Sequence, residues 1–502
     1  MSQKDCTAGE YRREGAAGAS GIFTHSSGLR RPTQLVTLLL LLAAAPALAG
    51  DAVPATPASP VLGSASGADP CVSGSIGSPL TLVEAVGRSL CHNPKTREAW
   101  AAIRLHAAQV RMAREGWLPD LGISLRESEG STQTHLNDIP GLDTSSLANW
   151  PEGSASMSWL LLDFGGRSAQ IESARQLFAA AQANLSVNQQ QVFLQVATDY
   201  YDAQAAQAVL DSAREIEQVT TDSVRAAHER VGKGIAPVSD ELQARTAHAQ
   251  AVVNRVKAQQ DLNSRSGALG IDMGLDPDQS LVLPVAAPDA REREAFSGSV
   301  HELIEQAKRE HPGILVAQRE LAASQQDERA VRARTLPSLS LVGQAGRSYE
   351  PLTPNLGSPS VPGHTTTGTI GVQLTVPLSD PLWKRGRIAE AQAQVQVQQE
   401  ALYEAQQKVA QDVWTSYTAL QADSENLASS QVLLDSARDS LDATRHRYEG
   451  GVGNILELLN SQQAYAEAAQ QRIRALSDWR ISRLALGASL GRLSLDAVTD
   501  TR

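Results

Sequence analysis

Four stretches of the chain alternate apolar and polar residues with a period of two. That period is typical of β-strands in which one face meets an apolar environment and the other a polar one. The apolar positions are Leu121, Ile123 and Leu125 in the first stretch, Ala155, Met157, Trp159 and Leu161 in the second, Leu339 and Leu341 in the third, and Ile370, Val372, Leu374 and Val376 in the fourth. The pattern predicts two strand pairs, one in each half of the chain.

Helical patterns surround each strand pair. The predicted helices cover residues 82–116, 167–231 and 238–270 in the first half, and 300–334, 387–449 and 455–490 in the second. The first helix of each half ends at a Leu-Pro step, which a helix seldom continues through. The second is very long, and its apolar residues are spaced alternately by three and four, as in a coiled coil. A glycine-containing turn then leads into the third helix, which is predicted to run back antiparallel to the second.

The two halves repeat one another. The matched landmarks, all separated by 217 to 220 residues, are Asn93-Pro94 with His311-Pro312, Leu118-Pro119 with Leu336-Pro337, Gly165-Gly166-Arg167 with Arg385-Gly386-Arg387, Tyr200 with Tyr417, and Gly234 with Gly451. Landmarks in one order at nearly constant spacing indicate a tandem repeat. We therefore expect two copies of one structural unit at residues 80–274 and 299–493, a linker at 275–298, and a short tail at 494–502.

The N-terminus carries the features of a secretory signal. Arg30 and Arg31 precede an apolar run at residues 35–48, and Ala47-Leu48-Ala49 supplies small residues at a cleavage site. Residues 1–49 are predicted to be a signal peptide and residues 50–79 an N-terminal periplasmic segment. No cysteine follows the cleavage site, so no lipid anchor is expected.

Composition argues against an ordinary compact enzyme. Aromatic residues make up only 4% of the chain, whereas large aromatic side chains usually dominate compact cores. The net charge is −11, and residues 1–49 contribute five basic and three acidic residues, so their removal leaves −13. An acidic balance disfavours nucleic acid as a partner. It suits either a lumen that tolerates cations or simply a solvated acidic surface.

Two cysteines remain after the predicted signal peptide, Cys71 and Cys91. In an exported protein they are predicted to form a disulfide bond; the alternative is two free thiols. No metal site, cofactor or catalytic group is expected. His301 and His311 are interpreted as helix-capping or solvated residues, and the Gly487-Ala488-Ser489-Leu490-Gly491 stretch lacks the strand that a nucleophile elbow requires.

Four strands cannot close a membrane barrel alone. An open edge would leave unpaired backbone groups in lipid, and the smallest bacterial single-chain barrels have eight strands. Three chains would supply twelve strands and a quasi-sixfold ring of helices. A dimer would supply eight, but its interior would be filled by side chains. The sequence thus predicts an α+β membrane protein with a trimeric twelve-stranded outer-membrane β-barrel that continues into a long periplasmic coiled-coil tunnel.

The residues that carry a family resemblance lie around the strands and turns. They are Leu162-Asp163-Phe164-Gly165-Gly166-Arg167, Arg385-Gly386-Arg387, Val238-Ser239-Asp240-Glu241-Leu242 and Ile455-Leu456-Glu457-Leu458-Leu459. These sequences, together with the duplication, resemble TolC-family outer-membrane channels over residues 80–493. Cys71, Cys91 and the sequence that leads into Asn93-Pro94 look like the CyaE branch, which exports cyclolysin-type toxins.

The resemblance implies partners and a function. TolC-family channels are homotrimers in outer-membrane lipid that dock to an inner-membrane transporter through a periplasmic membrane-fusion adaptor. The CyaE branch implies type I secretion, with an ABC transporter as the inner-membrane partner and an RTX or cyclolysin-type toxin in transit. One alternative is the outer-membrane component of a drug or metal efflux pump. Another, a periplasmic coiled-coil scaffold without a pore, would leave the four two-faced strands unexplained.

The resemblance also implies a site at the far end of the long helices. Asp240 and Glu457 match an acidic ring at the closed periplasmic tip, and Tyr448 matches a tyrosine that holds the closed helices together. The residues predicted to form the tip turns, where the adaptor docks, are Gly232, Gly234, Gly450, Gly451 and Gly453. Asp240 and Glu457 have a simpler alternative role, because the helix macrodipole favours acids in a first turn. Gly453 departs from the family pattern, which can have a gating arginine there.

Overall fold

The computed structural model describes residues 78–134, 144–285, 299–349, 363–378 and 381–493. These residues belong to one compact unit of the chain, Thr56–Arg502. The predicted signal peptide, nearly all of the 50–79 segment, Cys71 and the 494–502 tail lie outside the described residues. Within the described ranges, no helix combines the length and the apolarity that crossing a membrane requires.

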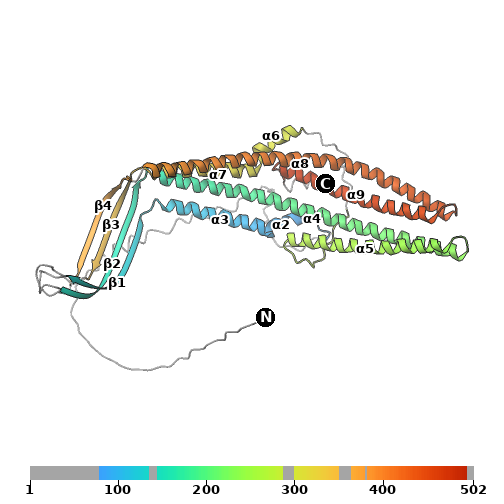
Figure 1. Ribbon diagram of the computed structural model, residues 1–502, viewed down its shortest axis with the longest axis horizontal. Helices are drawn as coiled ribbons and strands as arrows, with labels where there is room; N and C mark the ends of the chain where they lie inside the picture. The colour runs from blue at the N-terminus through green and yellow to red at the C-terminus, as the bar shows by residue number, and fades with distance from the viewer. Residues whose placement is uncertain (1–77, 135–143, 286–298, 350–362, 379–380, 494–502) are drawn as a thin grey trace, which may run out of the picture. The chain divides into compact units, whose positions relative to one another are not determined.

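Each half of the chain contains the same elements in the same order (Figure 1). The first half comprises α2 (Leu82–His92), α3 (Pro94–Glu115), β1 (Asp120–Thr134), β2 (Thr144–Leu162), α4 (Gly166–Gly232) and α5 (Val238–Asp272). The second comprises α6 (Val300–Glu310), α7 (Pro312–Ala333), β3 (Ser338–Ser348), β4 (Thr365–Thr375), α8 (Pro381–Glu449) and α9 (Ile455–Ser489). The repeat expected from the sequence is matched by this repeated order of elements.

The prediction of a single helix before each strand pair is wrong, because a break divides each of these helical segments into two helices. The breaks fall at Asn93-Pro94 and His311-Pro312, where proline lacks an N–H and disfavours helical geometry in the preceding residue. The residue before each proline then caps the new helix. Asn93 Oδ1 accepts a hydrogen bond from the Lys95 N–H at 3.0 Å, and His311 Nδ1 accepts one from the Gly313 N–H at 3.1 Å. Burial lowers the pKa of His311, which favours the neutral ring that this cap requires.

The four strands form one antiparallel sheet in the order β1-β2-β3-β4, so the central β2–β3 pairing joins the two halves. Its register places the predicted apolar positions on one face. The cross-strand neighbours on that face include Leu121 with Met157, Ile123 with Ala155, Trp159 with Leu341, Leu341 with Val372, and Leu339 with Leu374. Serine and threonine dominate the opposite face. Many apolar side chains are exposed, with Ile123 at 82% and Leu125 at 85%, so none of the described residues covers this face.

A buried arginine fastens the first strand pair to its long helix. Arg167 lies in the first turn of α4 and donates hydrogen bonds to the backbone carbonyls of Leu160 at 2.6 Å and Leu161 at 3.2 Å. It also forms an ion pair with Asp163 at 3.3 Å and stacks over the Trp117 ring at 4.1 Å. Charged hydrogen bonds of this kind are stronger than neutral ones. The arginine therefore fixes how α4 leaves β2.

The second joint uses different residues for the same purpose. Lys384, in the first turn of α8, donates to the carbonyls of Pro377 and Thr335. Arg387 stacks over the ring of Trp383 at 4.2 Å, and both side chains are exposed. The first joint is thus held by a buried ion pair and the second by a lysine and an exposed stack.

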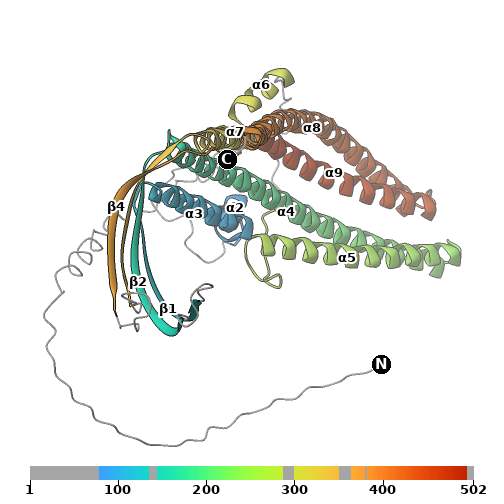
Figure 2. The same ribbon diagram turned by 60° about the vertical axis from the view of Figure 1, so that its left-hand side comes forward.

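Beyond the sheet, the helices form two antiparallel pairs, α4 with α5 and α8 with α9 (Figure 2). Helix α4 packs against α3 and α7 and also contacts α9, so the halves pack on one another. The largest core cluster joins α2, the middle of α4 and the end of α5, with Phe193 and Leu80 fully buried. A second cluster lies near the free end of both pairs and brings together residues of all four helices. That end holds the predicted site.

Candidate functional site at the helical tip

The helical tip consists of the turns at residues 233–237 and 450–454 with the adjoining ends of α4, α5, α8 and α9. In each turn one glycine has a positive φ, +70° for Gly234 and +81° for Gly451. The Ile235 N–H donates to the Arg230 carbonyl at 2.9 Å, and the Val452 N–H donates to the Arg447 carbonyl at 3.0 Å. In both bonds the N–H lies five residues after the carbonyl. This is the longer of the two bonds of a Schellman cap, which usually has glycine in the left-handed position. The sequence repeat therefore reappears as a repeated turn.

The remaining glycines of the predicted tip turns differ in how much space surrounds them. A Cβ on Gly453 would lie 2.7 Å from the backbone nitrogen of Tyr448, closer than packed atoms approach. A Cβ on Gly232 would meet nothing within 4 Å. The departure from a gating arginine at position 453 thus has a local cause, because the turn leaves no room there for any side chain.

Tyr448 lies between the two halves at the tip. Its side chain is only 2% exposed and belongs to the cluster formed by all four helices. Arg230, at the end of α4, stacks over the Tyr448 ring at 4.7 Å and donates a hydrogen bond to the Tyr448 carbonyl at 2.5 Å. Burial raises the pKa of Tyr448; the charge of Arg230 opposes this shift and that of Asp240 adds to it. Arg230 of the first half therefore binds the last turn of α8 at both the ring and the backbone carbonyl of Tyr448.

The two predicted acids of the tip have different surroundings. Glu457 accepts a hydrogen bond from Arg447 Nη1 at 2.5 Å across the α8–α9 turn, and both side chains are about half exposed. Asp240, in the first turn of α5, forms no ion pair with any described residue. The matched positions are therefore not electrostatically equivalent. Arg447 offsets the charge of Glu457, whereas no described arginine or lysine pairs with Asp240.

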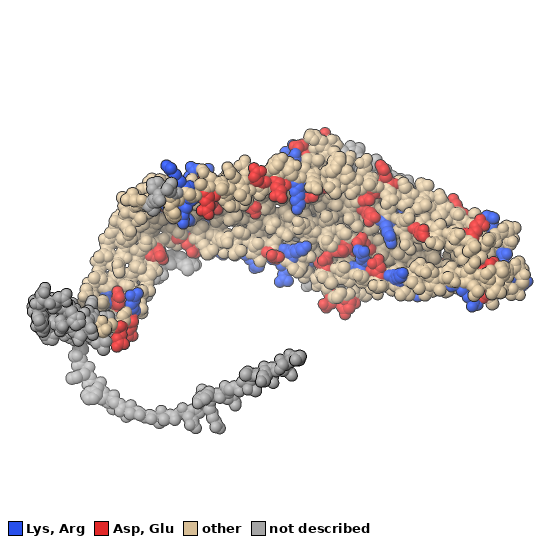
Figure 3. Space-filling view, viewed as in Figure 1, with Lys and Arg blue, Asp and Glu red and all other residues tan. Residues whose placement is uncertain are grey.

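A third carboxylate, which the sequence reasoning did not single out, joins α4 to α5. Glu241 is largely buried, accepts hydrogen bonds from His228 at 3.1 Å and from Arg245, and is thereby held beside α4. The hydrogen bond from His228, with smaller contributions from Arg245, lowers the pKa of Glu241. The tip surface accordingly carries basic and acidic side chains close together (Figure 3).

Further polar contacts cross between the halves above the tip. Gln462 Nε2 of α9 donates to Ser223 Oγ of α4 at 2.8 Å, and both residues are buried. The Tyr465 hydroxyl lies 3.5 Å from Glu215 Oε1. Buried polar pairs are costly to break because each partner is then left without a hydrogen bond. They fix the position of α9 on α4.

Matches to known proteins decide the family. The model of the family described as "Outer membrane efflux protein" matches residues 85–270 and 303–492, which is most of both halves. The chain belongs to the outer membrane efflux protein family. Members of this family are channels and transporters rather than enzymes. The protein is accordingly an outer-membrane protein whose helical part lies in the periplasm.

Individual relatives agree with the family assignment. Protein CyaE of Bordetella pertussis is 30% identical over 84% of this chain and 85% of its own length. Outer membrane protein TolC of Escherichia coli is 21% identical over 82% of each chain. The crystal structure of the Campylobacter jejuni CmeC outer membrane channel superposes with a TM-score of 0.70 at 16% identity, covering 84% of this chain and 89% of CmeC. The last match shows that the fold is shared.

The structure shows Cys91 to be disulfide-bonded. Its predicted partner, Cys71, lies outside the described residues, so the Cys71–Cys91 pairing stays a prediction. Among the residues that are described, no group of three or more His, Cys, Asp or Glu side chains is placed to hold a metal ion.

Sequence reasoning overlooked two kinds of tip residue. Arg230 and Arg447 are separated by 217 positions, so the repeat alignment itself marks them as matched basic residues at the ends of the long helices. The His228–Glu241 contact carries no such signal. It joins residues thirteen apart across a turn, and its formation depends on the angle at which α5 packs on α4.

Proposed function

We propose that three copies of this chain close into one outer-membrane conduit. The observation that carries this proposal is the four-stranded sheet, whose outer strands β1 and β4 have no partner on one edge among the described residues. Unpaired edges are not tolerated in lipid. Joining β4 of one copy to β1 of the next would remove every edge and give twelve strands in three copies, with the apolar face toward lipid.

The helices support the same assembly. Helix α3 packs against α4, whereas α8 packs against α7 and α9 on the opposite margin. Large apolar side chains remain exposed along these two margins: Leu105 and Met112 on α3, and Val397, Tyr403, Trp414, Val432 and Leu433 on α8. An apolar helix face in water normally marks an interface. A second copy would bring α3 of one chain beside α8 of the next.

The assembly is tested by the mass of the full-length protein in detergent. Light scattering that separates protein from detergent should give a mass near three subunits. A monodisperse monomer with an intact strand signal in circular dichroism would contradict the trimer.

For cargo, we propose type I secretion of an RTX or cyclolysin-type protein toxin. The support is the level of identity to Protein CyaE, 30% over 84% of the chain, compared with 21% to TolC, together with the CyaE-like Cys71 and Cys91. In this proposal an ABC transporter in the inner membrane and a membrane-fusion adaptor complete the path. The adaptor docks at the tip turns and in a nearby hollow of about 630 Å³ between α4, α5 and α9.

The second candidate is efflux of drugs or metals, and the family description names efflux without a substrate. A strain that lacks its own channel should distinguish the two when it carries this protein with either a toxin exporter or a drug pump. Toxin in the medium without restored drug tolerance supports secretion. Restored drug tolerance with no exported toxin would replace it with efflux.

At the tip, we propose that the Arg230–Tyr448 contact holds the closed state and that Asp240 and Glu457 favour cations. In a trimer these acids would form a ring of six carboxylates, three of which are offset by Arg447. Replacing Asp240 with Asn should therefore lower cation selectivity in planar-bilayer recordings more than Glu457→Gln does. Equal effects, or none, would leave both residues as helix-start acids.

A further inference from the structure

A shallow groove runs along the apolar face of the sheet. Its floor consists of small residues on the central strands, where Ala155 lies beside Ala345 and Gly153 beside Arg347. The neighbouring strand β1 raises a ridge beside this floor, because Ile123 and Leu125 protrude and are almost fully exposed. The ridge and floor form a strip wide enough for an extended apolar chain, in a region that already faces lipid.

A cationic side chain lies at the end of the groove that is farthest from the helices. Arg347 follows Ala345 by two residues on β3, so its side chain stands on the same face. Its guanidinium stacks over the Tyr349 ring at 4.8 Å, and Arg347 forms no ion pair with any described residue. The Tyr349 N–H donates to the Pro151 carbonyl at 3.1 Å, which holds Tyr349 beside β2.

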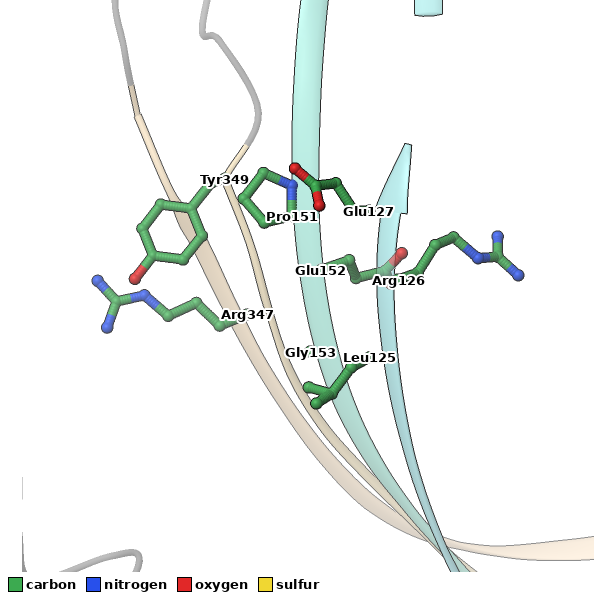
Figure 4. A pocket seen from close by; sticks show the side chains of 8 residues that line it. All are labelled: Leu125, Arg126, Glu127, Pro151, Glu152, Gly153, Arg347 and Tyr349. Carbon is green, nitrogen blue, oxygen red and sulfur yellow. The ribbon is translucent and has the colours of Figure 1, made fainter. Parts of the chain in front are cut away.

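A hollow of about 480 Å³ lies at this end of the groove, and Figure 4 shows the eight residues that line it: Leu125, Arg126, Glu127, Pro151, Glu152, Gly153, Arg347 and Tyr349. Gly153 keeps it open, since a Cβ there would lie 3.3 Å from Leu125 Cδ2. Arg347 and Tyr349 extend from the sheet in one direction, and Arg126 extends the other way. The register agrees, because Arg126 pairs with Glu152 on the polar face.

The depth of this hollow in the membrane follows from the fold. The helical part is periplasmic, so the ends of the strands remote from it face the exterior. Tyr349, which directly follows the end of β3, lies eight positions after Leu341, the partner of Trp159, a distance of about 26 Å at the usual rise per residue. That length is of the order of the apolar band of an outer-membrane barrel, which aromatic residues flank at both interfaces. Arg347 and Tyr349 therefore lie at headgroup level in the outer leaflet.

We propose that this groove binds a phosphorylated lipid of the outer leaflet, with an acyl chain along Gly153, Ala155 and Ala345 and a phosphate on Arg347. An arginine at the margin of an apolar face is stabilised by an anionic headgroup, because its planar guanidinium can donate two parallel hydrogen bonds to a phosphate. Stacking on the Tyr349 ring limits the orientations that the guanidinium can adopt. The proposal rests on the lipid-facing orientation of the sheet and does not depend on the cargo.

Among the described residues, Glu127 is an acidic group on the same face at this end of the groove. It pairs with Pro151 in the register and lies one row farther out than Arg347. Its negative charge opposes the binding of a phosphate, so Glu127→Gln should tighten lipid binding. Glu152 and Arg126 also line the hollow, but the register places their side chains on the polar face, opposite Arg347.

The experiment measures binding of bis-phosphorylated lipid A to the full-length protein in detergent by native mass spectrometry. Arg347→Gln should weaken binding about tenfold. Arg126→Gln removes an equivalent charge one row away on the opposite face and should leave binding within twofold. Ala345→Leu fills the groove and should weaken binding with Arg347 intact. Lipid A that lacks both phosphates should bind the unchanged protein as weakly as lipid A binds the Arg347→Gln variant.

Three outcomes would overturn the proposal. Equal losses in the Arg347 and Arg126 variants would indicate nonspecific charge attraction. Unchanged binding in both Arg347→Gln and Ala345→Leu would exclude the groove. Full competition by inorganic phosphate would mean that the site takes a free anion rather than a lipid. Light scattering on the same samples reports the mass of the assembly, so a failure of the trimer is recognised separately.

Discussion

Helices α4 and α8 are matched parts of the repeat with different environments. Positions 180 and 197 of α4 are alanines that are 5% and 1% exposed, whereas the matched positions 217 residues later on α8 are Val397 at 58% and Trp414 at 53%. Helix α4 lies among α3, α5, α7 and α9, whereas α8 lies at the margin of the chain. At these two pairs of matched positions, the larger apolar residue lies on α8, whose face the single chain leaves uncovered.

The joints between strands and helices also differ in how deeply their arginines are buried. At the first joint Arg167 and Asp163 are both largely buried, and at the second joint Arg387 and Trp383 are exposed. Removing one member of a buried ion pair leaves an uncompensated charge, whereas exposed charges are screened by water. The two arginines therefore provide a matched test of how each half is fixed to the sheet.

The largest expected effect comes from Arg167→Ala. The substitution removes the guanidinium from Asp163, which keeps only the backbone N–H of residue 167, and from two strand carbonyls, so the free energy of unfolding should fall by about 3–5 kcal/mol. Arg387→Ala should lower it by less than about 1 kcal/mol, because the stack that it removes is exposed. Chemical denaturation followed by circular dichroism measures both. Similar losses in the two variants would mean that the joints are energetically equivalent despite their different burial.

The next largest effect is expected in the tip turns. Gly453→Ala places a methyl group against the backbone of Tyr448 and should destabilise the tip by about 1–3 kcal/mol, as overpacking commonly does. An alanine at position 232 would have open space around its methyl group, and alanine has a higher helix propensity than glycine. Gly232→Ala should therefore be neutral or slightly stabilising. Hydrogen exchange of the tip amides compares the two variants. Unchanged protection in Gly453→Ala would show that the turn can shift at little cost.

Trp414 tests whether the exposed face of α8 is an interface. Trp414→Ala should weaken association between subunits by about 1–3 kcal/mol, within the range that large aromatic residues contribute at interfaces. It should leave the helix content of the dissociated chain unchanged. The mass distribution on dilution in detergent measures the first effect, and circular dichroism the second. A trimer as resistant to dilution as the unchanged protein would place Trp414 outside the interface.

The smallest effect is a pH dependence confined to the first half. Burial, together with a hydrogen bond that the protonated Asp272 carboxyl shares with Asp199, raises the pKa of Asp272, at the end of α5, to about 6, and the matched residue of α9 is Ser489. The folded state thus binds this proton more tightly than the unfolded state. The resulting stabilisation is complete below pH 3.8 and is lost as the pH rises through about 6.

The measurement is unfolding free energy against pH for the unchanged protein and for Asp272→Ser, which copies the second half. The variant should lose less stability between pH 4 and pH 6 than the unchanged protein does. An identical slope would assign the pH dependence to other carboxylates of the tunnel.

Much of the fold could be predicted from the sequence. Period-two alternation identified four strands. The three-four spacing identified α4 and α8, and most of the predicted ends of these two helices lie within a few residues of the observed ends. The same patterns missed the breaks before Pro94 and Pro312, although both prolines were recognised as repeat landmarks. Helical periodicity continues through a one-residue break, so the pattern alone does not reveal it.

The candidate site was only partly accessible from the sequence. The turns at Gly234 and Gly451 follow from the chain, because a tight helix reversal there requires a residue that tolerates a positive φ. The surroundings of Tyr448, by contrast, depend on Arg230, a residue 218 positions earlier. No local pattern encodes a contact at that separation.

The sequence by itself determined the repeated unit, the two faces of its strands and the places where its helices reverse. These features arise from the spacing of neighbouring residues, which side-chain direction converts into faces and turns. Only the tertiary structure decided that Arg447 offsets Glu457 while Asp240 stays uncompensated, that Arg167 is buried while Arg387 is exposed, and that Arg347 caps an apolar groove. Those differences depend on which surfaces meet when two halves with the same order of elements pack side by side, and packing gives matched residues unlike neighbours.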